Sequence, residues 1–393
     1  MNQNILLVQP KFPTPSKSLN HKDFLPIPLL KIASYHKTLN DAPHLVHGKV
    51  NTDFEPDLIY ITSLFTYWQK EFWDTTEYYR TLFPNTPINV GGIYVSLFFE
   101  NSEFQEKCAK LNVTANKGTV EKFEKSAPDY SFVDVDYQII HASRGCKRHC
   151  TFCGVWKIEP EFKPKKSIKN EVLKNKVVFY DNNLLANPFI ENILKELIDL
   201  KVNGKVVKSE SQSGLDGRLL TLKLAKLLKK ARFINPRIAW DGPFKEWKKV
   251  DKQIKILSKA GYNRKDISIF MIFNWEHNFE EMELKRKKCY EWGVQIADCR
   301  NRPLHQEFDN YNGRIKQTNK DYYIHKIQGW TDSKVKKFRK NIRRQNICIR
   351  NGYDFHSSKL ERKVIPKSDY HTITSMPSLE IKKILPDAWW PDF

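Results

Sequence analysis

Three of the seven cysteines, Cys146, Cys150 and Cys153, stand close together in the spacing C-x3-C-x2-C. A loop this compact can wrap one small inorganic object, and thiolates are the usual protein ligands of iron–sulfur clusters. A four-iron cluster held by only three thiolates leaves one iron free, which is the open position that distinguishes catalytic metal sites from structural ones. Lys147 and Arg148 add positive charge that favours the thiolate form. The segment therefore predicts a redox-active iron–sulfur site.

The alternative is that the same loop binds structural zinc, with His149 as the fourth ligand. Structural zinc sites usually take two separated pairs of ligands that close a tetrahedron. His149 and Cys150 are sequence neighbours, and both would have to bend onto one metal. We therefore favour iron and sulfide over zinc. The remaining cysteines are too dispersed to form a second cluster: Cys108, Cys289, Cys299 and Cys348.

The elements that must position this loop alternate regularly from Tyr137 onward. Short apolar runs that end in polar or small residues are typical of buried parallel strands, and the segments between them have helical periodicity. Six strand–helix units in succession predict a curved parallel sheet or partial (β/α)6 barrel of the TIM type, with reactive residues at the carboxyl ends of the strands. The cysteine loop follows the first strand. The predicted strands are residues 138–143, 177–181, 206–211, 237–241, 267–273 and 294–298.

The cysteine motif and its place after a strand resemble the radical S-adenosylmethionine (SAM) superfamily. Its hallmark is C-x3-C-x2-C after the first strand of a partial barrel, typically with an aromatic residue before the third cysteine, here Phe152. The resemblance implies that Cys146, Cys150 and Cys153 hold a [4Fe-4S] cluster whose fourth iron is chelated by the methionyl group of SAM. One electron from the reduced cluster would release a 5′-deoxyadenosyl radical. It also implies a reductant protein of the flavodoxin or ferredoxin type.

Polar residues after the second predicted strand are candidates for binding the methionyl amine. Many family members carry Gly-Gly-Glu there, whereas this chain has Asp181, Asn182 and Asn183. Carboxylate and amide oxygens suit an ammonium group. This acidic variant resembles those of the subgroup with an N-terminal cobalamin-binding-type domain.

Further candidates follow the third and fourth strands. Gln212 and Arg218 occupy the region where the family binds ribose and carboxylate, and Arg218 could contact the carboxylate in bidentate fashion. Asp241 ends the fourth strand, where it could face the ligand or the substrate. The alternative for Asp181, Arg218 and Asp241 is a structural role as a helix cap or in a strand-end ion pair.

A second α/β pattern precedes the barrel. Helical patterns at residues 28–39 and 71–82 alternate with short apolar runs, which argues for a small, mostly parallel sheet. These runs and the Gly91-Gly92 turn resemble the Rossmann-like cobalamin-binding domain that precedes many radical barrels. The D-x-H-x-x-G signature for a lower axial histidine is missing, so two outcomes stay open: a domain that binds cobalamin and a degenerate one without a cofactor. The predicted strands are residues 4–8, 58–63 and 88–90.

We expect four regions along the chain. They are a Rossmann-like domain over 1–116, a linker over 117–136, the radical SAM barrel over 137–320 and a basic extension over 321–393. The most basic segment, 325–350, could follow a phosphate backbone. A solvated amphipathic helix packed on the outer face of the barrel is the alternative that we favour.

Composition narrows the class of protein. The chain has 66 Lys and Arg against 45 Asp and Glu, a net charge of +21 that would attract phosphates, although much of the excess is scattered lysine. A 40% apolar fraction is enough for a packed core. The N-terminus lacks signal-peptide features, no run is long enough to span a bilayer, and the cysteines do not form a paired framework. We therefore expect a cytoplasmic protein without a membrane partner.

These patterns together predict a radical SAM enzyme, an iron–sulfur oxidoreductase or transferase that acts by hydrogen abstraction or methyl transfer. The basic tail slightly favours a nucleic-acid or phosphorylated substrate over a neutral metabolite. Two other classes stay open. One is a zinc-stabilised, non-catalytic nucleic-acid-binding protein, and the other is a degenerate barrel whose cluster is structural or relays electrons.

Overall fold

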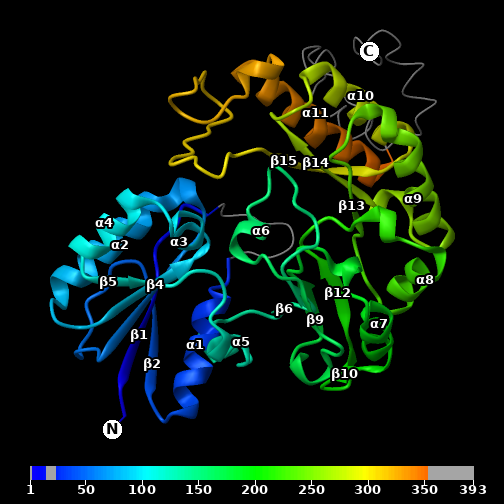
Figure 1. Cartoon of the computed structure of the whole chain (residues 1–393). Coiled ribbons are helices and arrows are strands. Elements are labelled where there is room, and N and C mark those ends of the chain that lie inside the picture. The colour runs from blue at the N-terminus through cyan, green and yellow to red at the C-terminus, as the bar shows by residue number, and fades with distance from the viewer. Residues whose placement is uncertain (1, 15–23, 353–393) are drawn as a thin grey trace, which may run out of the picture. The chain divides into compact units, whose positions relative to one another are not determined.

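The computed structural model describes residues 2–14 and 24–352 (Figure 1). The chain forms two compact units that exchange segments. The first holds the described residues up to Ile139 together with Ser143–Lys163 and Arg302–Asn310, and the second holds Ile140–Ala142, Pro164–Asn301 and the described residues from Tyr311 onward. The cysteine segment thus packs with the first unit, although it follows a strand of the other sheet. The periodicity of apolar residues in the sequence does not predict that the chain passes back and forth between the two units.

The first unit is built on a five-stranded parallel sheet in the order β2-β1-β3-β4-β5. Alternate residues of β1 face opposite sides: Leu6 and Val8 pack against α2, α3 and α4, whereas Ile5 and Leu7 pack against α1. A parallel sheet needs such helical cover on both faces. The strands are β1 (Asn4–Gln9), β2 (Ala42–His47), β3 (Leu58–Ser63), β4 (Ile88–Gly92) and β5 (Val113–Ala115). The helices are α1 (Ile27–Thr38), α2 (Gln69–Leu82), α3 (Ile93–Phe98), α4 (Ser102–Lys110) and α5 (Glu121–Glu124).

The predicted parallel α/β pattern of this unit is confirmed, with the expected strands and both expected helices in place. The sequence missed β2 and β5. β2 lies at the sheet edge and has no fully buried residue, so its segment lacks the apolar run that marks a central strand. β5 lies at the opposite edge and is only three residues long.

The second unit carries the six strands predicted from residue 137 onward. They form two three-stranded sheets, ordered β12-β9-β6 and β13-β14-β15, which isolated parallel bridges join at Ser209–Phe233 and Leu215–Ile238. The strands therefore follow one another in space in chain order, as a succession of strand–helix units requires. Their closure into a partial barrel stays a prediction. The strands are β6 (Gln138–Ile140), β9 (Lys176–Phe179), β12 (Lys208–Ser211), β13 (Arg237–Ala239), β14 (Ser268–Phe273) and β15 (Gln295–Arg300).

Helices cover these strands with their apolar faces (Figure 1). In α7, Ile193, Leu194 and Leu197 are fully buried, and they share one core with Phe179 of β9 and Phe273 of β14. The helices are α7 (Ile190–Asp199), α8 (Leu222–Lys230), α9 (Trp247–Lys259), α10 (Phe279–Glu291) and α11 (Asp332–Asn351). A short hairpin, β10 (Lys201–Val202) and β11 (Lys205–Val206), follows α7.

The most basic segment of the chain forms α11, which packs on the same core through Val335, Phe338 and Ile342. Its cation Arg339 pairs with Asp298 of β15 at 3.2 Å, so part of its charge is used within the unit. The favoured interpretation as a packed amphipathic helix is thus confirmed for this stretch, whereas residues 353–393 of the predicted extension lie outside the described residues. Neither α11 nor any other helix in the described part of the chain has the length and apolar character needed to cross a membrane.

Lys285 of α10 is a charged residue inside this core. Its side chain is fully buried, and the ammonium nitrogen lies 3.4 Å from the carbonyl oxygen of Trp240 and 5.2 Å from the centre of the Trp240 ring. Burial lowers the pKa of Lys285 from 10.5 to about 8, with the charges of Glu281 and Asp241 acting in the opposite direction. The folded protein therefore disfavours the ammonium form.

We expect Lys285→Met to stabilise the protein at neutral pH by at most roughly 3 kcal/mol, because each pKa unit corresponds to about 1.36 kcal/mol. The penalty in the wild type is fully present below pH 8 and disappears as the pH rises toward 10.5, since the folded state releases its proton first. Urea unfolding at pH 7 and pH 10 measures the difference between variant and wild type. Lys252→Met, at an exposed position on α9, is the control. A difference that does not shrink at pH 10 would contradict the assignment.

Candidate functional site: the cysteine loop and the strand ends

The cysteine segment is a loop closed at its base. Two short strands, β7 (Ser143–Arg144) and β8 (Lys163–Pro164), pair with each other, and the short helix α6 (Val155–Ile158) lies between them in sequence. The three cysteines therefore lie in one loop whose two ends are paired with each other.

Glu159 fixes the first turn of this loop. Its carboxylate accepts a hydrogen bond from the Gly145 backbone N–H at 2.8 Å and another from the Arg144 guanidinium. Gly145 has a φ of 71°, and a Cβ at this position would lie 2.1 Å from the carbonyl oxygen of Glu161. Glycine is thus required both by the left-handed backbone and by the close approach of a second segment.

The three cysteines are not in disulfide bonds, and they differ in exposure. Cys146 is buried, whereas Cys150 and Cys153 are half-buried. The Cys146 sulfur accepts a hydrogen bond from the Arg148 backbone N–H at 3.4 Å, and the Cys153 N–H donates to the Cys150 carbonyl at 3.0 Å. Phe152, which lies between Cys150 and Cys153 in the sequence, is half-buried.

The number and type of these donors fit an iron–sulfur cluster. Their positions in the structure do not yet form a ligand set, because no group of three or more His, Cys, Asp or Glu side chains in the described ranges is placed to hold a metal ion. The assignment of Cys146, Cys150 and Cys153 as cluster ligands stays a prediction.

Asp181, Asn182 and Asn183 follow β9 directly, as predicted, but they lie in different environments. Asp181 is fully buried and accepts a hydrogen bond from the Ala142 backbone N–H at 2.9 Å. Asn182 is half-buried. Asn183 is only 5% exposed, and its side-chain oxygen has no hydrogen-bond partner within the described part of the chain. An amide oxygen buried in this way costs about 1–3 kcal/mol unless something donates to it.

The residues predicted after β12 and β13 are partly engaged in local contacts. Gln212 is exposed, and its backbone N–H donates to the Phe179 carbonyl at 2.9 Å. Arg218 is also exposed and makes a two-pronged contact with Asp216, at 2.8 and 2.6 Å. Its fork is therefore satisfied by a protein carboxylate, in line with the structural alternative. Asp241 is half-buried, and its carbonyl lies 2.9 Å from a ring nitrogen of His277.

Sequence reasoning missed a buried ion pair on neighbouring strands. Glu210 of β12 and Arg237 of β13 approach to 3.7 Å, with each side chain about 10% exposed. Burial raises the pKa of Glu210 against the opposing effect of the Arg237 charge, and it lowers the pKa of Arg237. A carboxylate inside a predicted strand was the available signal, because such a residue needs a partner or a function.

The first unit has a cavity of about 400 Å³ at the carboxyl ends of β1 and β2. Lys11 and Phe12 follow β1, His47 ends β2, and Phe132 also lines the cavity. Open parallel sheets bind ligands outside their carboxyl ends. Cobalamin binding by this unit stays a prediction, with a unit that has no cofactor as the alternative.

No family model matches the chain, and no curated protein matches it. Among solved structures, the chain is similar to Streptococcus suis SuiB bound to S-adenosylmethionine, with 14% identity, a TM-score of 0.31, and coverage of 59% of this chain and 67% of that one. It is also similar to S. suis SuiB bound to the precursor peptide SuiA, with 14% identity, a TM-score of 0.33, and coverage of 56% and 55%.

We expect Gly145→Ala to open the cysteine loop. A Cβ at this position strains the left-handed backbone and collides with the Glu161 carbonyl. Limited trypsin digestion of the metal-free protein, followed at Lys147 and Arg148, should be roughly tenfold faster than in the wild type, which corresponds to about 1.4 kcal/mol of lost protection.

Gly204→Ala is the matched control. Gly204 has a φ of 75°, but a Cβ there meets nothing within 4 Å. It should show the backbone strain without faster cleavage in the cysteine loop. Equal cleavage at Lys147 and Arg148 in both variants would show that the contact with Glu161 does not hold the loop.

Proposed function

We propose that this chain is a radical SAM enzyme in which Cys146, Cys150 and Cys153 hold a [4Fe-4S] cluster with one open iron. The supporting observation is a closed loop with the spacing C-x3-C-x2-C, directly after the first of six strands that follow one another in chain order. In parallel α/β sheets the residues that do chemistry gather at the carboxyl ends of the strands. The loop follows such an end.

The thiols of this loop suit the task. None of them is in a disulfide bond, and the N–H of Arg148 donates to the Cys146 sulfur, a contact that stabilises a thiolate. Once bound and reduced, such a cluster supplies the electron that cleaves SAM into methionine and a 5′-deoxyadenosyl radical. The role of the chain is to draw the three side chains together within a loop whose base is already fixed.

We assign the SAM amine to Asn183 rather than to Asp181. The Asp181 carboxylate is fully buried and accepts from the backbone of Ala142, whereas the buried oxygen of Asn183 has no donor among the described residues. An ammonium group would supply that donor, and hydrogen bonds to charged groups contribute about 1.5–3 kcal/mol. Asn182 and Gln212 remain further candidates for polar contacts to SAM.

The substrate class follows from charge. A net charge of +21 favours a nucleic-acid or phosphorylated substrate over a neutral one. We do not assign the basic helix α11 as its binding surface, because Lys336 and Arg339 pair with Asp332 and Asp298 inside the unit. A flavodoxin- or ferredoxin-type reductant in the cytoplasm completes the proposal.

The decisive experiment is anaerobic reconstitution with iron and sulfide, followed by reduction in the presence of SAM. We expect about four irons and four sulfides per chain and release of 5′-deoxyadenosine. Alanine at Cys146, Cys150 or Cys153 should abolish the nucleoside product, because each removes a cluster ligand. Cys108→Ala is the control, since this buried thiol lies on α4, outside the loop.

Product formation that survives any of the three loop substitutions would refute the proposal. Stoichiometric zinc without iron in protein purified anaerobically would also refute it, in favour of the zinc-stabilised alternative.

A second measurement tests the assignment of Asn183. We expect Asn183→Ala to weaken SAM binding to the reconstituted, unreduced protein by about tenfold or more, which corresponds to one hydrogen bond to a charged group. Equilibrium dialysis with labelled SAM measures the affinity. Asn192→Ala, which removes an exposed amide on α7, should bind SAM like the wild type. Unchanged binding by Asn183→Ala would remove this residue from the site.

A further inference from the structure

The two ends of the cysteine loop meet at one hydrogen bond. Ala142 is the last residue before the loop and Lys165 is the first residue after β8. The Lys165 backbone N–H donates to the Ala142 carbonyl at 2.8 Å. The segment between these two residues, which includes all three cysteines of the motif, is therefore a loop whose two ends lie side by side in the second unit.

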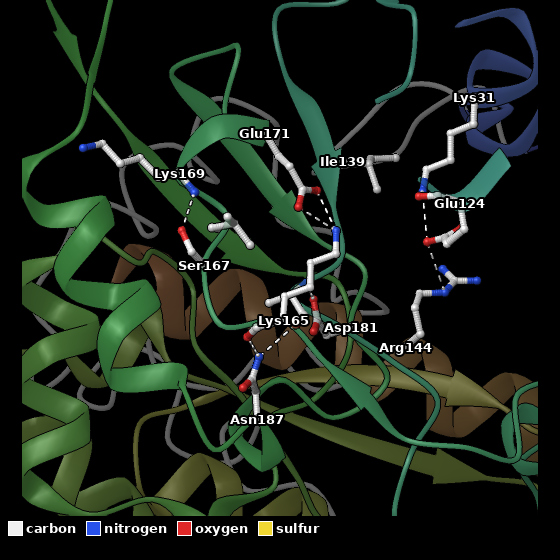
Figure 2. Close-up of polar contacts among 12 residues, drawn as sticks. Lys31, Glu124, Ile139, Arg144, Lys165, Ser167, Lys169, Glu171, Asp181 and Asn187 are labelled. Atoms are coloured by element: carbon white, nitrogen blue, oxygen red, sulfur yellow. Dashed lines mark hydrogen bonds and ion pairs between the residues drawn. The ribbon is translucent and has the colours of Figure 1, made fainter. Parts of the chain in front are cut away.

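The side chain of Asn187 ties both ends together. Asn187 lies in the connection between β9 and α7 and is only 1% exposed. Its amide nitrogen donates to the Ala142 carbonyl at 2.8 Å and to the Lys165 carbonyl at 3.1 Å. Its amide oxygen accepts from the Phe189 N–H at 2.8 Å, so both protons and the oxygen of the amide have partners. Figure 2 shows Asn187 beside Lys165.

Asp181 binds the other backbone polar group of Ala142. Its carboxylate accepts from the Ala142 N–H at 2.9 Å, while the Asn187 amide donates to the Ala142 carbonyl. Both polar groups of Ala142 are thus bound by buried side chains that follow β9. Lys165 is further held by Glu171, whose carboxylate lies 2.6 Å from its ammonium nitrogen (Figure 2).

We propose that Asn187 is a positioning residue that closes the cysteine loop and so presets it for cluster binding. Closing a long loop costs conformational entropy, and buried hydrogen bonds at its ends offset that cost before any metal arrives. The link to the cluster rests on the proposed function. The closure itself does not.

The two halves of the Asn187 amide can be separated by mutation. The oxygen caps the turn before α7, whereas only the nitrogen joins the loop ends. Asn187→Asp keeps an acceptor for the Phe189 N–H and loses both donors. Asn187→Ser also keeps an acceptor and adds no charge, and its single, shorter O–H donor cannot bond to both carbonyls at once, so agreement between the two variants excludes a simple charge effect.

Asn192→Asp is the matched control. The Asn192 amide also donates to a backbone carbonyl just beyond the loop, that of Lys166 at 3.0 Å, but from an exposed position on α7. The same chemical change therefore occurs close to the loop without touching either of its ends.

The experiment has a metal-free and a metal-bound part. In metal-free protein, hydrogen exchange of residues 143–164 should become about tenfold faster in both Asn187 variants and stay unchanged in Asn192→Asp, which corresponds to about 1.4 kcal/mol of lost closure. After reconstitution, the Asn187 variants should retain roughly tenfold less iron in a chelator competition and show an altered electron paramagnetic resonance spectrum of the reduced cluster. A variant that changed only global stability would not produce a loop-specific change in exchange.

The outcomes separate the two proposals. Unchanged exchange in the loop of Asn187→Asp and Asn187→Ser overturns the closure role, even if the wild type carries a working cluster. If exchange in the Asn187 variants is faster only in residues 143–164, while the reconstituted wild type binds no iron, the closure role is supported and the proposed function is refuted.

Discussion

The backbone of Ala142 is the constraint on which the candidate site depends. Its carbonyl receives hydrogen bonds from Lys165 and Asn187, and its N–H is bound by Asp181. The two side-chain contacts are buried, which keeps water from replacing them, and the loss of either leaves a buried polar group with fewer hydrogen bonds. The position from which the thiols leave the second unit is therefore determined by residues that touch neither a metal nor a substrate.

The order of the strands explains why these particular residues can reach Ala142. β9 lies next to β6 in the sheet, so the residues that follow β9 emerge beside the end of β6. Helices on the strands exclude water from this layer through residues such as Leu194 and Leu197. Burial of this kind strengthens the polar contacts at the strand ends, and it also makes each charge within the layer costly unless it is paired.

The basic residues of this chain have different roles in the structure from those that the composition suggests. The excess of lysine and arginine is a property of the whole chain, and it favours anionic partners without locating them. In the structure, Arg339 is committed to an ion pair, and Lys285 lies inside the core. A dense run of basic residues in a sequence can thus serve packing as much as recognition.

The sequence by itself determined the α/β class of both units, the six successive strands and the C-x3-C-x2-C loop after the first of them. These features depend on residues that are close together in the sequence, because apolar periodicity and cysteine spacing are local patterns. It did not determine that the cysteine segment packs with the first unit, that Asp181 binds a backbone amide, or that Asn187 joins the loop ends. Those facts depend on pairs of residues far apart in the chain, and only tertiary packing decides which buried polar groups become partners.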